Sequence, residues 1–409
     1  MGPERATRGV LPLALAWLAL VAPASGDETS GIDGGALYRE RCAECHEGGV
    51  ARAPGVAALR RLSADAIKAA LAGGSMSIQG EKLTPAQREA VSRFLAGPAA
   101  AAEATPAQGQ CAEAEQAPVD LAAGPHWNGW GVDAAQHRFQ PADMAKLSAE
   151  DLPRLKLKWS FGFGSVSRAS AQPTVMGGRL FVGSLTGKVY SLDAKSGCLE
   201  WTFEAMGPVR TAVSIGKSAN GWAAYFGDQR ANAYAVDALT GNLLWRSHVD
   251  EHRVARITGA PTLADGVLYV PVTSAEEVAG ADPQYPCCSF RGSVVALDAA
   301  SGKTLWKAYT IPEEPKPVRK NERDVQLWGP SGAGVWSSPT IDPDKAMVYV
   351  TTGDSYSDPP AATSDAFVAF HRENGALAWS RQMTEGDAFT VACSRAAAGT
   401  NNCPKAGGP

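Results

Sequence analysis

The sequence has no block of basic residues, little imbalance of charge and no apolar stretch long enough to span a membrane after its first residues. Its 409 residues carry a net charge of −4, which favours no particular kind of partner. The missing basic block removes nucleic acid from the expected partners. The apolar run at residues 10–21 has about half the length that a bilayer requires. We therefore expect no membrane span in the mature chain.

The first residues have the pattern of a secretory signal. Arg5 and Arg8 precede the apolar run, and small residues follow it at 22–26. We expect residues 1–26 to be a cleaved signal peptide, with an uncleaved anchor as the alternative. Export would place the chain in the periplasm, where its eight cysteines can form disulfides.

A heme-attachment pattern follows the signal. Cys42, Cys45 and His46 form C-x-x-C-H, in which two nearby thiols can bond to a haem and the next residue offers an imidazole to its iron. A zinc site or a redox-active cysteine pair is the alternative for these residues.

The residues around this motif favour the haem. Helical periodicity covers 63–72, the loop 73–80 holds Met76, and a second helix is expected over 84–95 with Thr84 as its N-cap. This order of elements resembles a class I cytochrome c domain at 27–97, and the resemblance implies His46 and Met76 as the iron ligands. A methionine in a loop otherwise usually contributes packing.

Residues 98–125 are rich in Ala, Pro, Gln and Glu and have almost nothing to bury, so they are expected to be a linker. Cys111 lies inside it and could pair with Cys198, although a sequence cannot determine disulfide connectivity.

The rest of the chain is built from a repeat. Residues 188–201 (KVYSLDAKSGCLEW) recur at 232–245, 293–306 and, less regularly, 366–379, and each copy has a Gly four residues before its Trp. Alternating apolar residues predict a strand, the polar residue before the Gly predicts a tight turn, and the segment ending in Trp predicts the returning strand. A further strand is expected before each copy, at 179–183, 223–227, 267–271 and 347–351. Residues 155–161 resemble an outer strand. We expect a β-propeller over 126–409.

One aligned position in each blade carries a side chain suited to binding. The segments that precede the four inner strands begin at Ser170, Arg210, Thr258 and Trp336. An aromatic plate beside a cation and hydroxyl groups suits a flat, polyanionic ring. The alternative is that Trp336 packs within its blade and Arg210 is solvated.

These repeats and the stretches 265–276 and 336–354 resemble the pyrroloquinoline quinone (PQQ) dependent alcohol dehydrogenases. The resemblance implies that Trp336 lies under PQQ and that Arg210 and Thr258 contact it. It also implies that Glu276 and Asp354 bind Ca²⁺, for which oxygen ligands are suited. Asp354 stands where the family more often has Asn.

The sequence departs from the family in two places. Adjacent cysteines often precede the family's Arg, but here Val209 does so, and the adjacent pair is Cys287–Cys288 in a later loop. These two either form a vicinal disulfide near PQQ or pair with distant cysteines. The family's catalytic Asp is expected beyond Pro409, with Asp387 as a weak candidate, because four repeats account for about half of the family's eight blades.

A cytochrome c domain followed by such a propeller is identified as a quinohaemoprotein dehydrogenase, and residues 286–307 are most similar to the polyvinyl alcohol dehydrogenase branch. The resemblance implies PQQ, Ca²⁺ and haem c as cofactors and oxidation of a secondary alcohol, including a polymeric one, to a ketone. Electrons would pass through the haem to a periplasmic acceptor such as a soluble cytochrome c. The alternative is a non-catalytic propeller scaffold or electron-transfer module.

Overall fold

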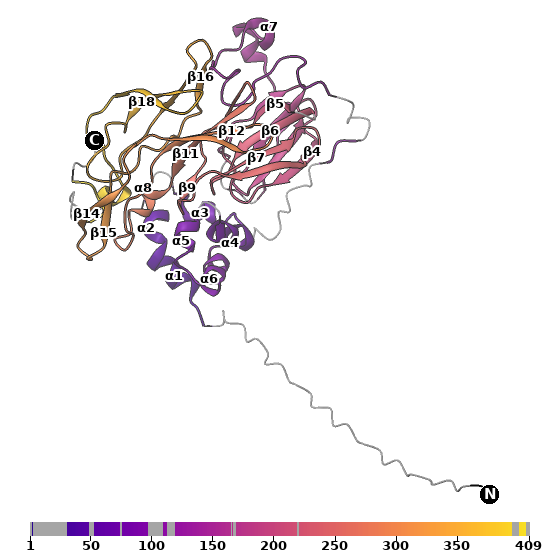
Figure 1. Cartoon of the computed structure of the whole chain (residues 1–409). Coiled ribbons are helices and arrows are strands. Elements are labelled where there is room, and N and C mark those ends of the chain that lie inside the picture. Colours follow the sequence, from indigo (N-terminus) through magenta and orange to yellow (C-terminus); the bar gives the residue numbers. More distant parts are fainter. Residues whose placement is uncertain are drawn as a thin grey trace.

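The computed structural model describes residues 2, 31–48, 53–73, 76–96, 109–112, 119–164, 166, 169–218, 221–394 and 401–405. The predicted signal peptide, apart from Gly2, and most of the predicted linker lie outside these residues. Figure 1 shows a group of short helices at the N-terminal side of a row of β-sheets. No helix in the described part of the chain is long and apolar enough to cross a bilayer.

The N-terminal helices form a small domain with its own core. Buried Tyr38, Leu71 and Val91 belong to this core, and Cys42 and Met76 pack against it. Asp33 caps the first helix by accepting from the Gly35 and Ala36 amides at 2.9 and 3.0 Å. The helices are α1 (Gly34–Arg41), α2 (Ala43–His46), α3 (Val56–Leu59), α4 (Ala64–Gly73), α5 (Ser77–Gly80) and α6 (Pro85–Leu95).

The helices expected over 63–72 and 84–95 are confirmed by α4 and α6. Thr84 caps α6 in a capping box with Gln87, and Pro85 occupies the first turn. The loop expected over 73–80 differs, because α5 forms within it. The Gly80 amide donates to the Met76 carbonyl at 2.8 Å, so Met76 stands at the start of a helical turn.

The remaining chain forms four antiparallel sheets of four strands in sequence order, as expected for propeller blades (Figure 1). The first two blades are β1 (Thr174–Met176), β2 (Arg179–Gly183), β3 (Lys188–Asp193), β4 (Leu199–Glu204) and β5 (Ser214–Ser218), β6 (Gly221–Gly227), β7 (Asn232–Asp237), β8 (Leu243–His248). The next two are β10 (Thr262–Ala264), β11 (Val267–Ser274), β12 (Ser293–Asp298), β13 (Thr304–Tyr309) and β16 (Thr340–Asp342), β17 (Met347–Thr351), β18 (Ala366–His371), β19 (Leu377–Gln382). The short β9 (Ala255–Arg256) extends the third sheet by pairing with β11.

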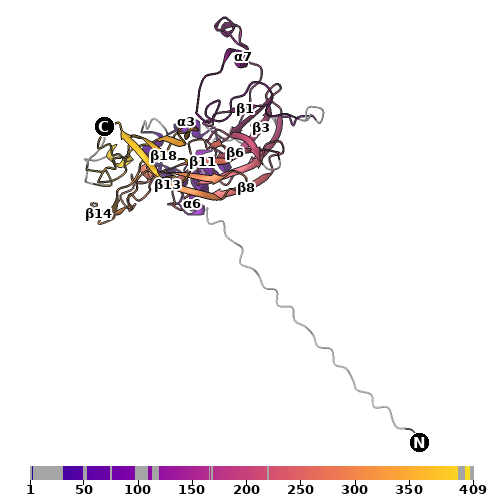
Figure 2. The same ribbon diagram turned by 45° about the horizontal axis from the view of Figure 1, so that its top comes forward.

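Smaller elements surround the blades. They are α7 (Ala142–Ala145), the 3-10 helix η3 (Ala149–Arg154), α8 (Glu276–Ala279), the hairpin β14 (Lys316–Lys320) and β15 (Gln326–Gly329), and the 3-10 helix η4 (Val391–Ser394). The view in Figure 2 shows α7 projecting away from the sheets. Figure 1 places α8 and β9 on the side of the sheets that faces the N-terminal helices.

Each of four Trp residues, Trp159 and the first three repeated ones, contacts the following blade. Its indole N–H donates to a carbonyl in the following blade, and its ring covers the Gly of that blade's turn. The donor and acceptor pairs are Trp159 to Ala194, Trp201 to Ala238, Trp245 to Ala299 and Trp306 to Arg372, at 3.2, 3.0, 2.9 and 3.1 Å. A Cβ on Gly241 would lie 2.8 Å from the Trp201 ring, so a side chain does not fit there.

The outer strand expected over 155–161 does not form. Residues 155–161 are not part of any strand that the described chain forms. Trp159 nevertheless makes the same contact with the following blade as the Trp residues of the other repeats. The sequence signal therefore marks the Trp contact between blades rather than a paired strand.

Residues 127–136 cross the innermost strands of all four blades, and we call them the crossing segment. Trp127 exchanges backbone hydrogen bonds with Val175 of β1, and the Asn128 side chain binds the backbone of Ile215 in β5. Farther along, Gln136 donates to Thr262 of β10 at 2.9 Å, and Ala134 accepts from Ile341 of β16 at 2.9 Å. The crossing segment thus fixes the four inner strands relative to one another.

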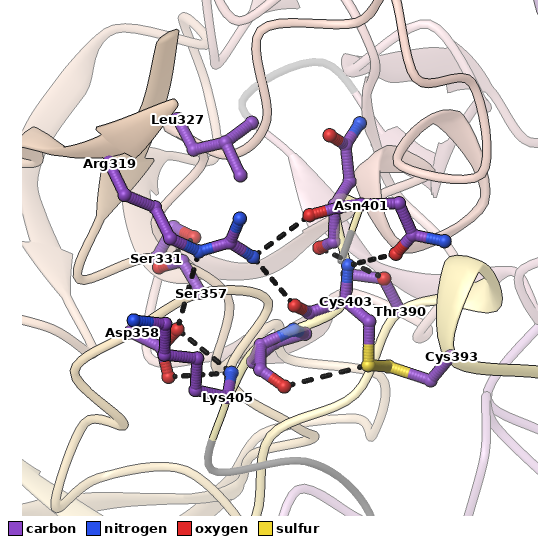
Figure 3. Close-up of polar contacts among 12 residues, drawn as sticks. Arg319, Leu327, Ser331, Ser357, Asp358, Thr390, Cys393, Asn401, Cys403 and Lys405 are labelled. Carbon is purple, nitrogen blue, oxygen red and sulfur yellow. Dashed lines mark hydrogen bonds and ion pairs between the residues drawn. A yellow bond between two sulfur atoms is a disulfide. The ribbon is translucent and has the colours of Figure 1, made fainter. Parts of the chain in front are cut away.

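The C-terminal described residues fold back over the loop that contains Cys287. Arg319 donates to the carbonyls of Asn401 and Cys403 at 2.9 and 2.8 Å, and the Lys405 amide donates to Asp358 (Figure 3). Asn402 donates to the Tyr285 carbonyl at 3.1 Å. The described disulfides pair Cys111 with Cys198, Cys287 with Cys288, and Cys393 with Cys403.

Candidate functional site

The first site lies in the helical domain. Cys42 and Cys45 are half-buried, and burial together with the neighbouring Cys45 raises the pKa of the Cys42 thiol. The Nδ1 atom of His46 is 2.7 Å from the Pro54 carbonyl, which orients the ring and leaves Nε2 available to an iron. Met76 packs against the same core as Cys42. This arrangement fits a covalently attached haem.

The helical domain contacts the propeller next to Met76. Ile78 of α5 packs against a buried propeller cluster that includes Cys287 and Cys288. Lys82 forms an ion pair with Asp282. Arg230 donates to the carbonyl of Gly73, at the end of α4, at 3.3 Å. The Met76 side of the domain therefore faces the propeller.

The second site lies where the aligned positions of the blades meet. The backbones of two blades approach each other closely at Gly259. A Cβ at this position would lie 2.8 Å from the Trp336 carbonyl, so only Gly fits. Trp336 is 40% exposed, whereas the adjoining Thr258 is 9% exposed and its Oγ1 has no partner in the described structure. A flat exposed indole beside a buried hydroxyl without a partner fits a planar ligand with polar substituents. Arg210 and Ser170, at the same position of the earlier blades, are both exposed.

Acidic side chains gather beside Trp336. A Cβ on Gly353 would lie 3.1 Å from Trp336 Nε1, which places Asp354 next to the indole. Burial and, after it, the charges of Asp387 and Glu277 together raise the pKa of Asp354 to about 6. The side chains of Asp354 and Asp387 share a hydrogen bond. Burial and then the charge of Asp365 raise the pKa of Asp387.

Asp387 reaches this position because the chain turns back after the last blade. The Ser355 amide donates to the Asp387 carbonyl at 3.3 Å, and the Phe389 amide donates to the Ser355 carbonyl at 2.8 Å. Ser364 Oγ also donates to the Asp387 carbonyl, at 3.1 Å. The segment that carries the weak candidate Asp387 is thus fixed against the residue that follows Asp354.

The carboxylates of Glu276 and Glu277 lie in different environments. The Glu276 carboxylate is fully buried and accepts from the Ser289 and Phe290 amides at 2.9 and 2.8 Å and from the Tyr285 hydroxyl at 3.0 Å. Consecutive residues of a helix are turned by about 100° from one another. Because α8 begins at Glu276, it is Glu277 whose charge acts on Asp354. Sequence spacing predicts a role for Glu276 and does not single out Glu277.

Cys287 and Cys288 form a disulfide with each other across a cis peptide bond. Both are almost fully buried; the Cys287 carbonyl accepts from the Trp328 amide of β15 at 2.8 Å, and the Cys288 amide donates to the Trp328 carbonyl at 3.3 Å. Glu276 binds the amides of the two residues that directly follow them. The disulfide therefore lies close to α8 and belongs to the buried cluster against which Ile78 of the helical domain packs.

The acidic cluster does not form a complete metal site by itself. In the part of the chain that the structure describes, no three His, Cys, Asp or Glu side chains are close enough to hold a metal ion. Glu277 and Asp354 could contribute oxygen ligands to a hard cation such as Ca²⁺ only together with other donors.

Two family models match this chain. The model for the β-propeller domain of glucose, ethanol and alcohol dehydrogenases matches residues 127–397. The model for subunit III of cbb3-type cytochrome c oxidase matches residues 31–95. These matches imply PQQ and haem c as cofactors, and Ca²⁺ is typical of the first family.

Similar proteins cover both parts. A polyvinylalcohol dehydrogenase of a Pseudomonas species is 39% identical over 96% of this chain, and one of Sphingopyxis sp. strain 113P3 is 37% identical over 96%. The chain spans 63% and 62% of the length of these two relatives. The crystal structure of quinohemoprotein alcohol dehydrogenase from Comamonas testosteroni is 25% identical, with a TM-score of 0.52 over 64% of this chain and 42% of that one.

Proposed function

We propose, because the chain belongs to the family of glucose, ethanol and alcohol dehydrogenase β-propeller domains, that it oxidises alcohols with PQQ and passes the electrons to its own haem. One observation carries this proposal: Thr258 and Trp336 adjoin on successive blades, with the acidic pair Asp354 and Asp387 beside the indole. The finer assignment is oxidation of a secondary alcohol to a ketone. The names of the two relatives make polyvinyl alcohol the first polymer to test.

PQQ, when bound together with Ca²⁺, would supply the acceptor for the two electrons and the hydrogen that leave the alcohol. Trp336 would support the flat ring on its exposed face, and Thr258 would donate its unpartnered hydroxyl. Arg210 would pair with a carboxylate of the ligand. Asp354 and Glu277 would contribute oxygens to the cation, whereas the Glu276 carboxylate is already occupied by the amides of Ser289 and Phe290.

Asp387 is our candidate for the base. A base must accept the proton of the alcohol hydroxyl at a carboxylate oxygen, and a raised pKa makes a carboxylate better suited to that role at neutral pH. Asp387 has such a pKa and shares a hydrogen bond with Asp354. We therefore prefer Asp387 to a residue beyond Pro409.

The helical domain would accept the electrons one at a time. The contacts of Ile78 and Lys82 with the propeller support a direct path from the quinone site to the haem. We place the mature protein in the periplasm, after removal of a signal peptide at 1–26, with a soluble cytochrome c as the expected next acceptor.

The test is dye-linked oxidation of propan-2-ol by the purified chain supplied with PQQ and Ca²⁺, with haem reduction followed by absorbance. Asp387→Asn should lower the turnover rate about 100-fold or more without loss of PQQ binding. Glu385→Gln, an exposed change in the same segment, is the matched control and should have no effect.

Full activity of Asp387→Asn would show that Asp387 is not the base. The same assay on a chain extended by its downstream coding sequence would then show whether the base lies beyond Pro409. A haem that is redox-active in a chain that neither binds PQQ nor oxidises alcohol would instead support an electron-transfer module.

A further inference from the structure

A second arginine, Arg256, lies beside Arg210. It belongs to β9, where it pairs in register with Thr273 of β11. Its neighbours Ala255 and Ile257 are both buried in the propeller core. Because alternate residues of an extended chain point to opposite sides, Arg256 lies on the side away from that core.

Backbone contacts bring the two arginines together. The Gln229 amide donates to the Pro208 carbonyl at 2.9 Å, two residues before Arg210. The Gln229 side chain in turn accepts from Arg256 Nη1 at 3.1 Å. Gln229 therefore links the segment before β5, which carries Arg210, to β9, which carries Arg256.

The surroundings of Arg256 do not neutralise its charge. Burial and, second, the positive charge of Arg210 lower the pKa of the Arg256 guanidinium. Among the described residues the charge recorded as acting on Arg256 is that of Arg210, no ion pair with a carboxylate is recorded for it, and its hydrogen-bond acceptor, Gln229, is neutral. A partly buried cation beside a second cation is unfavourable unless an anion neutralises it.

A second observation points to a ligand at the same place. Thr258 follows Arg256 by two residues, is 9% exposed, and has a hydroxyl without a partner in the described structure. It adjoins Trp336 through the close approach at Gly259. A guanidinium, a buried hydroxyl and an exposed indole are thus neighbours, and a planar polycarboxylate matches all of them.

We infer that Arg256 is a binding residue that, together with Arg210, holds a carboxylate of the planar quinone cofactor. This inference rests on the proposed function, because it assumes that PQQ binds next to Trp336. It adds a residue that neither the repeat alignment nor the family spacing identified. The guanidinium offers two parallel N–H groups to one carboxylate, an arrangement that Lys does not reproduce.

The test measures PQQ binding to the full haem-containing chain by quenching of Trp fluorescence, with thermal unfolding of the PQQ-free protein alongside. Arg256→Gln should raise the Kd for PQQ about 10- to 100-fold. Arg256→Lys should give a smaller increase. Arg381→Gln, an exposed change on β19, is the matched control and should leave the Kd unchanged.

Thermal unfolding separates binding from structure. Removal of an uncompensated cation should leave the unfolding temperature of the PQQ-free protein unchanged or raise it. An unchanged Kd for Arg256→Gln overturns the inference. So does an unchanged Kd combined with a shifted haem reduction potential, because that result assigns Arg256 to the haem propionates.

A second probe keeps the inference testable if the wild-type chain does not bind PQQ, which would refute the proposed function. Benzene-1,3,5-tricarboxylate is flat and carries three carboxylates. It should raise the unfolding temperature of the wild-type chain but not that of Arg256→Gln. An equal response of both proteins, or no response of either, overturns the inference.

Discussion

Asp354→Asn in the cofactor-free protein should increase stability at neutral pH. The structure places Asp354 beside Asp387 and Glu277, and its pKa is about 6 instead of the usual 3.8. A difference of about 2 units corresponds to about 3 kcal/mol if the full shift applies. Because Asp354 is only partly buried, we expect about half of this, roughly 1.5 kcal/mol at pH 7.

The effect should depend on pH in a definite direction. An Asp with a raised pKa in the folded protein ionises more easily in the unfolded chain, so wild-type stability falls as the pH rises from about 4 to about 6. Asn carries no charge and lacks this dependence. The difference in unfolding free energy between variant and wild type should therefore be less than about 0.5 kcal/mol at pH 4 and reach its full value near pH 7.

Urea unfolding of both proteins between pH 4 and pH 7.5, without PQQ or Ca²⁺, measures this difference. Asp143→Asn, an exposed change in α7, is the control. Its difference in unfolding free energy from the wild type should not change with pH. A gain of equal size at every pH would show that packing and not charge is responsible. A variant less stable than the wild type at pH 7 would refute the arrangement of the three carboxylates.

Three further changes test the blades and the two cofactor sites. Gly302→Ala should lower the unfolding free energy by about 2–4 kcal/mol, because its Cβ would lie 2.6 Å from the Trp245 ring and its φ is +71°. Gly266→Ala, with a φ of +77° and open space around it, should cost only about 1 kcal/mol; equal losses in urea unfolding would contradict the contact. Met76→Ala should remove the low-spin absorbance signature of a Met-ligated haem while the haem stays covalently attached, and persistence of that signature would mean another ligand. Trp336→Ala should abolish PQQ binding in a fluorescence titration and leave the haem spectrum unchanged, and retained binding would refute the site.

The sequence predicts the blades well because their signals are local. Alternation of apolar residues, the turn at Gly197 and the spacing to Trp201 all lie within one hairpin, and the strands β3 and β4 follow them. The contact that Trp201 makes is not predicted in this way, because its partner Ala238 belongs to the next copy of the repeat. Repetition indicates that the Trp matters but not which blade it contacts.

The site could be predicted only in part for a related reason. Spacing counts residues along a strand, but Glu276 begins the helix α8, and the charge of the next residue, Glu277, also acts on Asp354. The position of Asp387 depends on backbone hydrogen bonds with Ser355, and no local pattern in the sequence around Asp387 predicts them. The role that we infer for Arg256 could not be predicted from the sequence, because it depends on Arg210, which lies in another blade.

The crossing segment also has a consequence for synthesis. It leaves the ribosome before any of the four blades, yet Gln136 binds the Pro339 carbonyl, 203 residues later in the chain. At roughly 5–20 residues per second, the ribosome needs on the order of 10–40 s to make that partner. During this interval Ala134 and Gln136 of the crossing segment lack their partners Ile341 and Pro339, so the first part of the propeller to be made is among the last that can be completed.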